Sequence, residues 1–283
     1  MKIIFGNLIQ RVATAVLLAP LVILSILMLP TFYFGLGLVA MILVGAWEWA
    51  RLAGYTSKIK RIAYVLATAV LLYVAFRLDA IFPYGWLLLS ITALVWWCVA
   101  LGLVVQFEQG ISISFLKSPV VRVFVGWLIL VPTWGALAVI HRYAEIGPIL
   151  IVLLMMFVWG ADTGAYFFGK RFGKKRLSPR ISPGKSWEGV AGGALIAGLL
   201  SVAVGFYAQF PLEQWIVFIF FSLITVTLSI LGDVTESLFK RQVGIKDSGS
   251  LLPGHGGVLD RIDSLTATAP FFALSLFLWG YIA

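Results

Sequence analysis

The segment 233–263 holds the residue types best suited to chemistry, because acidic side chains alternate there with lysine and arginine. Its charged residues are Asp233, Glu236, Lys240, Arg241, Lys246, Asp247, Asp260, Arg261 and Asp263. Carboxylates can hold a divalent cation, and the basic groups can neutralise phosphate. The segment lies between two apolar runs, where ionisable residues are expensive enough to indicate a functional site.

Helical spacing predicts how these side chains are grouped. If the apolar run before Gly232 continues as a helix, one face carries a polar stripe of Asp233, Glu236, Ser237, Lys240 and Arg241. Asp260 and Asp263 open the last apolar run three residues apart, side by side at a helix N-terminus. Before them, Gly254, Gly256 and Gly257 surround His255 and permit close backbone approach to a ligand.

Carboxylates with one histidine and no cysteine suit Mg²⁺ rather than Zn²⁺. The chain's single cysteine, Cys98, also excludes an internal disulfide and a cysteine-based metal site. Mg²⁺ typically binds one or two carboxylates and takes its remaining ligands from water and substrate phosphate. The residue types therefore predict Mg²⁺-dependent phosphoryl or nucleotidyl transfer at a membrane surface.

A second charged patch lies at 162–189. The residues that share a helix face through their four-residue spacing are Asp162, Tyr166 and Lys170. Further along, Ser182, Lys185 and Ser186 belong to a Ser-Pro-Gly-Lys-Ser turn before a helix, where backbone N–H groups can cradle phosphate. The turn lacks the upstream glycine of a P-loop. Spacing alone leaves phosphate binding open, while the basic residues nearby also suit anchoring to anionic lipid.

Membrane-spanning helices must position both patches. The chain has 283 residues, of which 61% are hydrophobic and only 12% charged, whereas soluble domains carry about 25% charged residues. The sequence predicts an all-α, polytopic transmembrane protein with about nine spans. The predicted spans are roughly 12–29, 32–50, 62–78, 84–105, 120–141, 147–169, 188–209, 212–232 and 264–282.

The basic residues predict the orientation of these spans. The net charge is +9, but its distribution indicates topology rather than nucleic-acid binding. With the N-terminus inside, all Lys and Arg residues except Arg77 and Arg142 fall at cytoplasmic ends and loops. This asymmetry predicts an N-in, C-out protein with both charged patches at the cytoplasmic side.

The chain accordingly divides into two regions. Residues 1–145 form about five N-terminal spans, and 146–283 form the catalytic region with cytoplasmic loops 170–187 and 233–263. Glu48 and Arg51 are the notable charges of the first region. Because Glu48 lies between Trp47 and Trp49, and Arg51 follows near the same helix end, we interpret them as an interfacial cluster rather than as site residues.

The C-terminal motifs resemble a known family. The run Ser237-x2-Lys240-Arg241-x4-Lys246-Asp247-x5-Pro253-Gly254-His255-Gly256-Gly257-x2-Asp260-Arg261-x-Asp263 looks like the signature of the phosphatidate cytidylyltransferases, without departure at any defined position. Two further stretches resemble the same family: Asp162-x2-Ala165-Tyr166 and Ser182-Pro183-x-Lys185-x-Trp187-Glu188-Gly189. Together these motifs cover roughly the last 125 residues.

The resemblance implies a reaction in which CTP and phosphatidate give CDP-diacylglycerol and pyrophosphate in a bacterial-type inner membrane. Asp233 and Asp260 match the family's metal-holding acids, with Asp263 assisting, and Mg²⁺ is the expected cation. The resemblance leaves open a second cation such as K⁺ and a homodimer.

The residues expected to be catalytic are Asp233, Lys240, Arg241, Lys246, Asp247, His255, Asp260, Arg261 and Asp263. The residues expected to bind CTP or phosphate are Asp162, Tyr166, Ser182, Lys185, Ser186, Glu188, Ser237, Gly256 and Gly257. His255 could donate to phosphate or position its turn.

Two other function classes fit parts of the pattern. A CTP-dependent polyprenol or dolichol-type kinase would bind CTP similarly but transfer the γ-phosphoryl group, so its nucleotide product would be CDP. A transporter of an anionic solute would line a pathway with charges, often in two related halves. The charges here gather at one end and no internal repeat is visible, which favours an enzyme.

Overall fold

The computed structural model describes residues 16–82, 84–143, 145–251 and 256–282. Within these ranges the chain forms long helices and one small hairpin. The long helices are α2 (Thr31–Leu52), α3 (Lys58–Ile81), α4 (Gly85–Glu108), α5 (Pro119–Arg142), α6 (Gly147–Phe172), α7 (Trp187–Tyr207), α8 (Leu212–Gln242) and α9 (Leu259–Leu278). The 3₁₀ turn η1 (Ser114–Lys117) precedes α5, and an apolar helix covers Val16–Met28.

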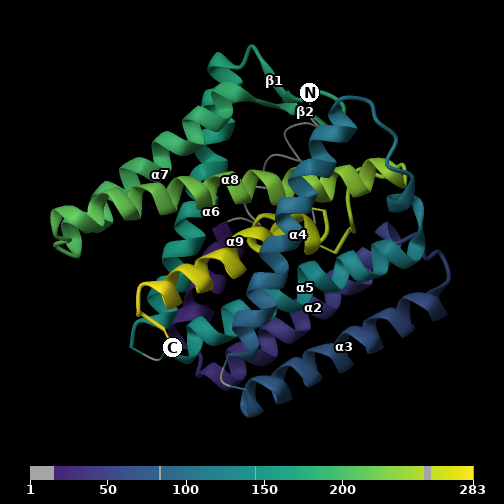
Figure 1. Ribbon diagram of the computed structural model, residues 1–283, viewed down its shortest axis with the longest axis horizontal. Helices are drawn as coiled ribbons and strands as arrows, with labels where there is room; N and C mark the ends of the chain where they lie inside the picture. The colour runs from purple at the N-terminus through teal and green to yellow at the C-terminus, as the bar shows by residue number, and fades with distance from the viewer. Residues whose placement is uncertain (1–15, 83, 144, 252–255, 283) are drawn as a thin grey trace.

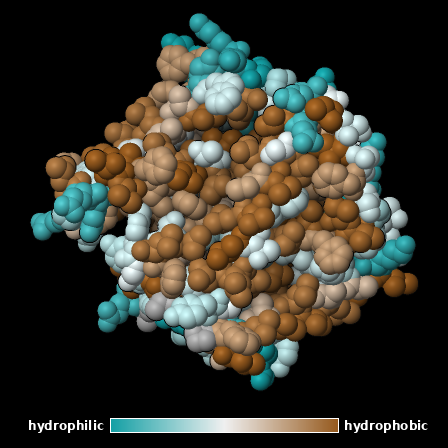
Figure 2. All heavy atoms as spheres, in the orientation of Figure 1, coloured by the Kyte–Doolittle hydropathy of each residue, from teal (hydrophilic) through white to brown (hydrophobic). Residues whose placement is uncertain are grey.

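The expected all-α, polytopic membrane class is confirmed. Within the described ranges, seven helices, α2 to α8, are long and apolar enough to cross a membrane. Figure 2 shows apolar side chains over most of the visible face, with hydrophilic residues gathered at its margins. The first expected span, 12–29, lies partly outside the described residues. The ninth expected span, 264–282, falls on helix α9, which runs from Leu259 to Leu278, includes Asp260 and Asp263 and is not among the seven.

Helices α8 and α9 pack against each other beneath α4, and α9 also packs on α5 (Figure 1). Their crossing point is set by Gly232, where a Cβ atom would lie 2.5 Å from the backbone oxygen of Asp263. Only glycine permits this approach. Because Asp233 follows Gly232 directly on α8, the crossing brings Asp233 of α8 and Asp263 of α9 to the same level along the helix bundle.

Three connections meet at the same end of the molecule, and Arg122 ties them together. Its buried guanidinium donates to the Leu52 oxygen (3.2 Å), the Leu116 oxygen (2.5 Å) and Gln242 Oε1 (3.1 Å). These contacts join the last residues of α2 and α8 to the turn before α5. The loops after α2, α4 and α8 therefore lie together. Arg241 at the end of α8 donates to the Ile181 oxygen and joins the loop after α6 to them, as the predicted topology requires.

One element differs from the sequence prediction. The Ser182–Ser186 stretch, expected to be a turn, is strand β2 (Ser182–Ser186), which pairs antiparallel with β1 (Arg176–Ser178). Phosphate binding by this stretch remains a prediction. Ser186 ends the strand and caps α7, since its hydroxyl accepts the Gly189 N–H at 3.1 Å. This two-stranded hairpin projects at the end of α6 in Figure 1.

Candidate active site

A buried pair of opposite charges forms one half of the site. Lys240 on α8 lies 2.8 Å from Asp260 Oδ1 on α9 and 3.2 Å from Glu236 Oε1, and all three side chains are at most 9% exposed. Asp260 also accepts the backbone N–H groups of Ser248 (3.0 Å) and Gly257 (2.8 Å). Two carboxylates thus share one lysine, and Asp260 is held from three directions.

A more open pair forms the other half. Lys185, on the hairpin, lies 2.6 Å from Asp233 Oδ2, and the two side chains are 25% and 33% exposed. Ser237 donates its hydroxyl to Asp233 Oδ1 at 3.3 Å, one helical turn away. Asp162 on α6 is exposed and interacts electrostatically with Lys185, Asp233 and Arg261. The second patch of the sequence therefore meets the first at Asp233.

Asp263 connects the two halves. Its Oδ1 accepts the Ser264 N–H at 2.7 Å, and its charge interacts with those of Asp233, Lys240 and Lys185. Asp263 also interacts with buried Glu236. Within the described ranges, Glu236 Oε1 pairs with Lys240 and Oε2 has no hydrogen-bond partner.

The donor set of this cluster is all carboxylate oxygen, which fits a hard cation such as Mg²⁺. However, no group of three acids, histidines or cysteines in the described part of the chain converges closely enough to hold a metal. Asp233 and Asp260 are instead paired with lysines. The metal-binding roles of Asp233, Asp260 and Asp263 remain predictions.

Other predicted residues lie around the cluster rather than in it. Arg241 donates from Nε to the Ile181 oxygen (3.0 Å) and so fastens the hairpin to α8. Glu188 accepts the Lys175 N–H (3.2 Å), which closes the base of the hairpin. Tyr166 is exposed, with Lys170 Nζ 5.6 Å from its ring centroid.

The remaining predicted residues belong to the loop after α8 and to the hairpin. Lys246 and Asp247 are exposed, Ser182 is half-buried, and Gly256 has a positive φ of 80°. His255 lies outside the described residues, so its role stays a prediction.

Sequence reasoning missed three acids, of which Glu48 is the most surprising. It is only 3% exposed and accepts hydrogen bonds from Ser248 Oγ, Val258 N and Leu259 N. The interfacial interpretation of Glu48 is therefore wrong, because the carboxylate is buried against the C-terminal loop. Arg51 nearby is exposed and donates to the Ser248 oxygen at 3.2 Å.

Glu108, at the end of α4, was also missed. Its carboxylate accepts the Ser178 hydroxyl (2.5 Å) and the Ile181 N–H (2.9 Å), and so it holds the tip of the hairpin. Glu236 was placed in the polar stripe but given no role. The N-terminal helices thus supply two acids that contact the loops of the site.

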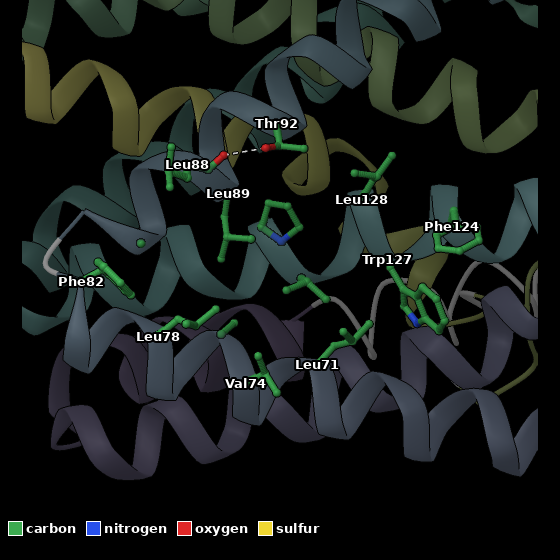
Figure 3. A pocket seen from close by; sticks show the side chains of 14 residues that line it. Leu71, Val74, Leu78, Phe82, Leu88, Leu89, Thr92, Phe124, Trp127 and Leu128 are labelled. Atoms are coloured by element: carbon green, nitrogen blue, oxygen red, sulfur yellow. Dashed lines mark hydrogen bonds between the residues drawn. The ribbon is translucent and has the colours of Figure 1, made fainter.

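A large apolar cavity lies elsewhere, between α3, α4 and α5 (Figure 3). Its volume is about 680 Å³, and no charged residue lines it. Thr92 contributes a hydroxyl group to the lining, and this hydroxyl donates to the Leu88 oxygen at 2.7 Å. The cavity suits hydrocarbon, and none of the acids or lysines described above lines it.

The chain is similar to known proteins over nearly its whole length. The pattern of the Cytidylyltransferase family matches residues 9–279. The chain is 45% identical over 272 residues to the phosphatidate cytidylyltransferase of Pseudomonas aeruginosa, covering 96% of this chain and 98% of that protein. It is 39% identical over 283 residues to the enzyme of the same name from Haemophilus influenzae, covering 95% and 98%. The chain belongs to the cytidylyltransferase family.

Proposed function

We propose that this protein transfers the cytidylyl group of CTP to phosphatidate, giving CDP-diacylglycerol and pyrophosphate. The observation that carries the proposal is the pairing of Lys185 with Asp233 and of Lys240 with Asp260 at one end of an apolar helical bundle. CTP and phosphatidate are both polyanions and repel each other, and lysine ammonium groups can neutralise part of their charge. The apolar bundle suits a substrate that stays in the membrane.

The reaction needs little acid–base chemistry. The phosphomonoester of phosphatidate is largely anionic near neutral pH, because its second pKa is about 6. Its oxygen attacks the α-phosphorus of CTP, a new P–O bond forms, and the bond to the β-phosphate breaks to release pyrophosphate. The protein must suppress the repulsion between the two reactants and align them.

The open pair is best placed to receive phosphate. Lys185 is 25% exposed and stands on a hairpin, so it can exchange Asp233 for a substrate phosphate without entering the core. Lys240 is buried among Glu236 and Asp260 and serves mainly to hold those acids in place. Arg261 and Asp162 border the open side.

The proposal includes Mg²⁺, held by Asp233, Asp260 and Asp263. When bound, the cation would neutralise phosphoryl oxygens and favour departure of pyrophosphate. Glu236, whose Oε2 has no hydrogen-bond partner within the described ranges while Oε1 pairs with Lys240, offers a further oxygen ligand beside them. Titrating the purified protein with Mg²⁺, and separately with K⁺, while following pyrophosphate release tests how many cations act.

The nucleotide product tests the reaction itself. The purified protein is incubated with CTP and phosphatidate in mixed micelles, and the products are separated by chromatography. Pyrophosphate and a cytidine-containing lipid are expected. Formation of CDP with a phosphorylated lipid alcohol would instead indicate a CTP-dependent lipid kinase and contradict the proposal.

We further propose that the site faces the cytoplasm from a bacterial inner membrane, where CTP is available. The test uses Lys174→Cys in the hairpin loop and Glu145→Cys at the opposite end, with exposed Cys98 replaced by Ser. A membrane-impermeant maleimide applied to intact cells should label the Glu145→Cys protein and spare the Lys174→Cys protein. The reverse pattern would overturn the topology.

A further inference from the structure

Glu48 stands out because its carboxylate is buried although the proposed reaction gives it no role. It lies on α2, in the N-terminal half, and is 3% exposed. Burying a carboxylate is costly unless hydrogen bonds compensate for the lost water. Glu48 must therefore be stabilised by its donors, and these identify the part of the molecule on which it acts.

All of these donors belong to the segment 248–259. Glu48 Oε2 accepts the Leu259 N–H at 2.7 Å and the Ser248 hydroxyl at 3.2 Å, while Oε1 accepts the Val258 N–H at 3.2 Å. Val258 and Leu259 begin α9, whose N-terminus has no side-chain cap of its own. Glu48 therefore caps α9 from another helix, where a negative charge favours the helix dipole.

The loop is shaped to fit around this carboxylate. A Cβ atom at Gly249 or Gly257 would collide with a Glu48 oxygen. Any side chain at either position would force the loop and the carboxylate apart. Glycine at these two positions thus allows the backbone to close on Glu48.

The same loop holds Asp260 from its other side. Ser248 gives its hydroxyl to Glu48 and its N–H to Asp260, at 3.2 and 3.0 Å. The next two N–H groups also go to different carboxylates. Gly257 donates its N–H to Asp260 at 2.8 Å, and Val258 donates its N–H to Glu48 at 3.2 Å. Both described ends of the loop are therefore held between the two carboxylates.

We propose that Glu48 is a positioning residue, which fixes the two described ends of the 248–259 loop (248–251 and 256–259) and through them the orientation of Asp260. It reaches no substrate; it acts by keeping Ser248 and Gly257 where they can hold Asp260 beside Lys240. The effect on turnover rests on the proposed cytidylyl transfer, whereas the effect on the loop does not.

The experiment compares Glu48→Gln, Glu48→Asp and Glu48→Ala in the purified full-length protein. Glu145→Gln, an exposed acid at the opposite end, is the matched control. Two quantities are measured on each protein: hydrogen exchange of peptides covering 248–259, and kcat with KM for phosphatidate. Losses of about 10- to 100-fold are typical when a group that orients a site acid is removed.

We expect exchange in 248–259 to accelerate in all three Glu48 variants, most in Glu48→Ala, while peptides of α3 and α4 keep the wild-type rate. The kcat should fall by about 10- to 100-fold with KM little changed. Glu48→Asp should recover part of the loss because it keeps the charge. Glu145→Gln should match the wild type in both measurements.

Two results would overturn the proposal. One is faster exchange in the loop with unchanged kcat, which would make Glu48 purely structural. The other is faster exchange throughout the protein, which would mean that the loss follows general unfolding. A wild-type protein that released no pyrophosphate would contradict the proposed function alone, because the exchange measurement needs no substrate.

Discussion

The two acid–lysine pairs of the site differ in how they are held. Asp260 and Lys240 are both 9% exposed, and Asp260 accepts two backbone N–H groups from the loop that Glu48 holds on its other side. Asp233 and Lys185 are 33% and 25% exposed, and their lysine stands on a hairpin at the margin. The comparison separates a rigid half, in which Asp260 is held in a fixed orientation, from an accessible half, in which Lys185 can exchange Asp233 for a substrate phosphate.

The largest loss of activity is expected when Asp233 of the accessible half or Asp260 of the rigid half is replaced. Asp233→Asn and Asp260→Asn should each lower kcat/KM by roughly 1,000-fold, because either change removes a cation contribution of several kcal/mol. The double variant should be scarcely worse than either single one, since both acids serve one cation. Pyrophosphate release above the blank rate measures this. Losses that multiply would show that the halves act independently.

Lys240→Met tests the rigid half through stability. The change leaves Glu236 and Asp260 buried without their cation, and breaking a buried pair in this way costs about 3 to 5 kcal/mol. Thermal unfolding of the detergent-solubilised variant should therefore occur at a clearly lower temperature than in the wild type. An unchanged unfolding temperature would mean that the buried half tolerates uncompensated charge.

Lys185→Met is the matched change in the accessible half. Because this pair is partly exposed, its loss should alter stability by less than about 1 kcal/mol. Turnover should still fall roughly 100-fold, as expected for one lost charge contact to a reacting phosphate. Thermal unfolding and kcat are measured on the same sample. A variant as unstable as Lys240→Met would erase the distinction between the halves.

The smallest effect is expected for Glu108→Gln. Glu108 holds the hairpin by Ser178 and Ile181, but Arg241 fastens the Ile181 oxygen separately. The hairpin therefore keeps its place, and kcat should fall less than about tenfold. A loss as large as that of Glu48→Gln would show that the hairpin depends on this one carboxylate.

Periodicity was enough to predict the helical part of the site. The stripe containing Asp233, Ser237 and Lys240 follows from residue spacing, and α8 does continue as a helix to Gln242. Asp260 and Asp263 were correctly placed in the first turns of the last helix. These features are local, so a sequence pattern can carry them.

The missed features depend on contacts between distant residues. Strands of three and five residues in a polar stretch leave no clear alternation, so the hairpin was read as a turn. Glu48 lies between two tryptophans, a pattern typical of a membrane interface, and its donors are 200 to 211 residues away in sequence. The sequence around Glu48 gives no sign of hydrogen-bond donors that lie so far along the chain.

That separation has a consequence for biosynthesis. At about 5 to 20 residues per second, synthesis of the intervening chain takes roughly 10 to 40 s. Glu48 lies one helical turn from the end of α2 at Leu52, about 6 Å along the axis, so its carboxylate can stay hydrated while it waits. Arrival of α9 removes this water and closes the loop around it. Among the described helices, α9 is thus the one whose synthesis completes the site.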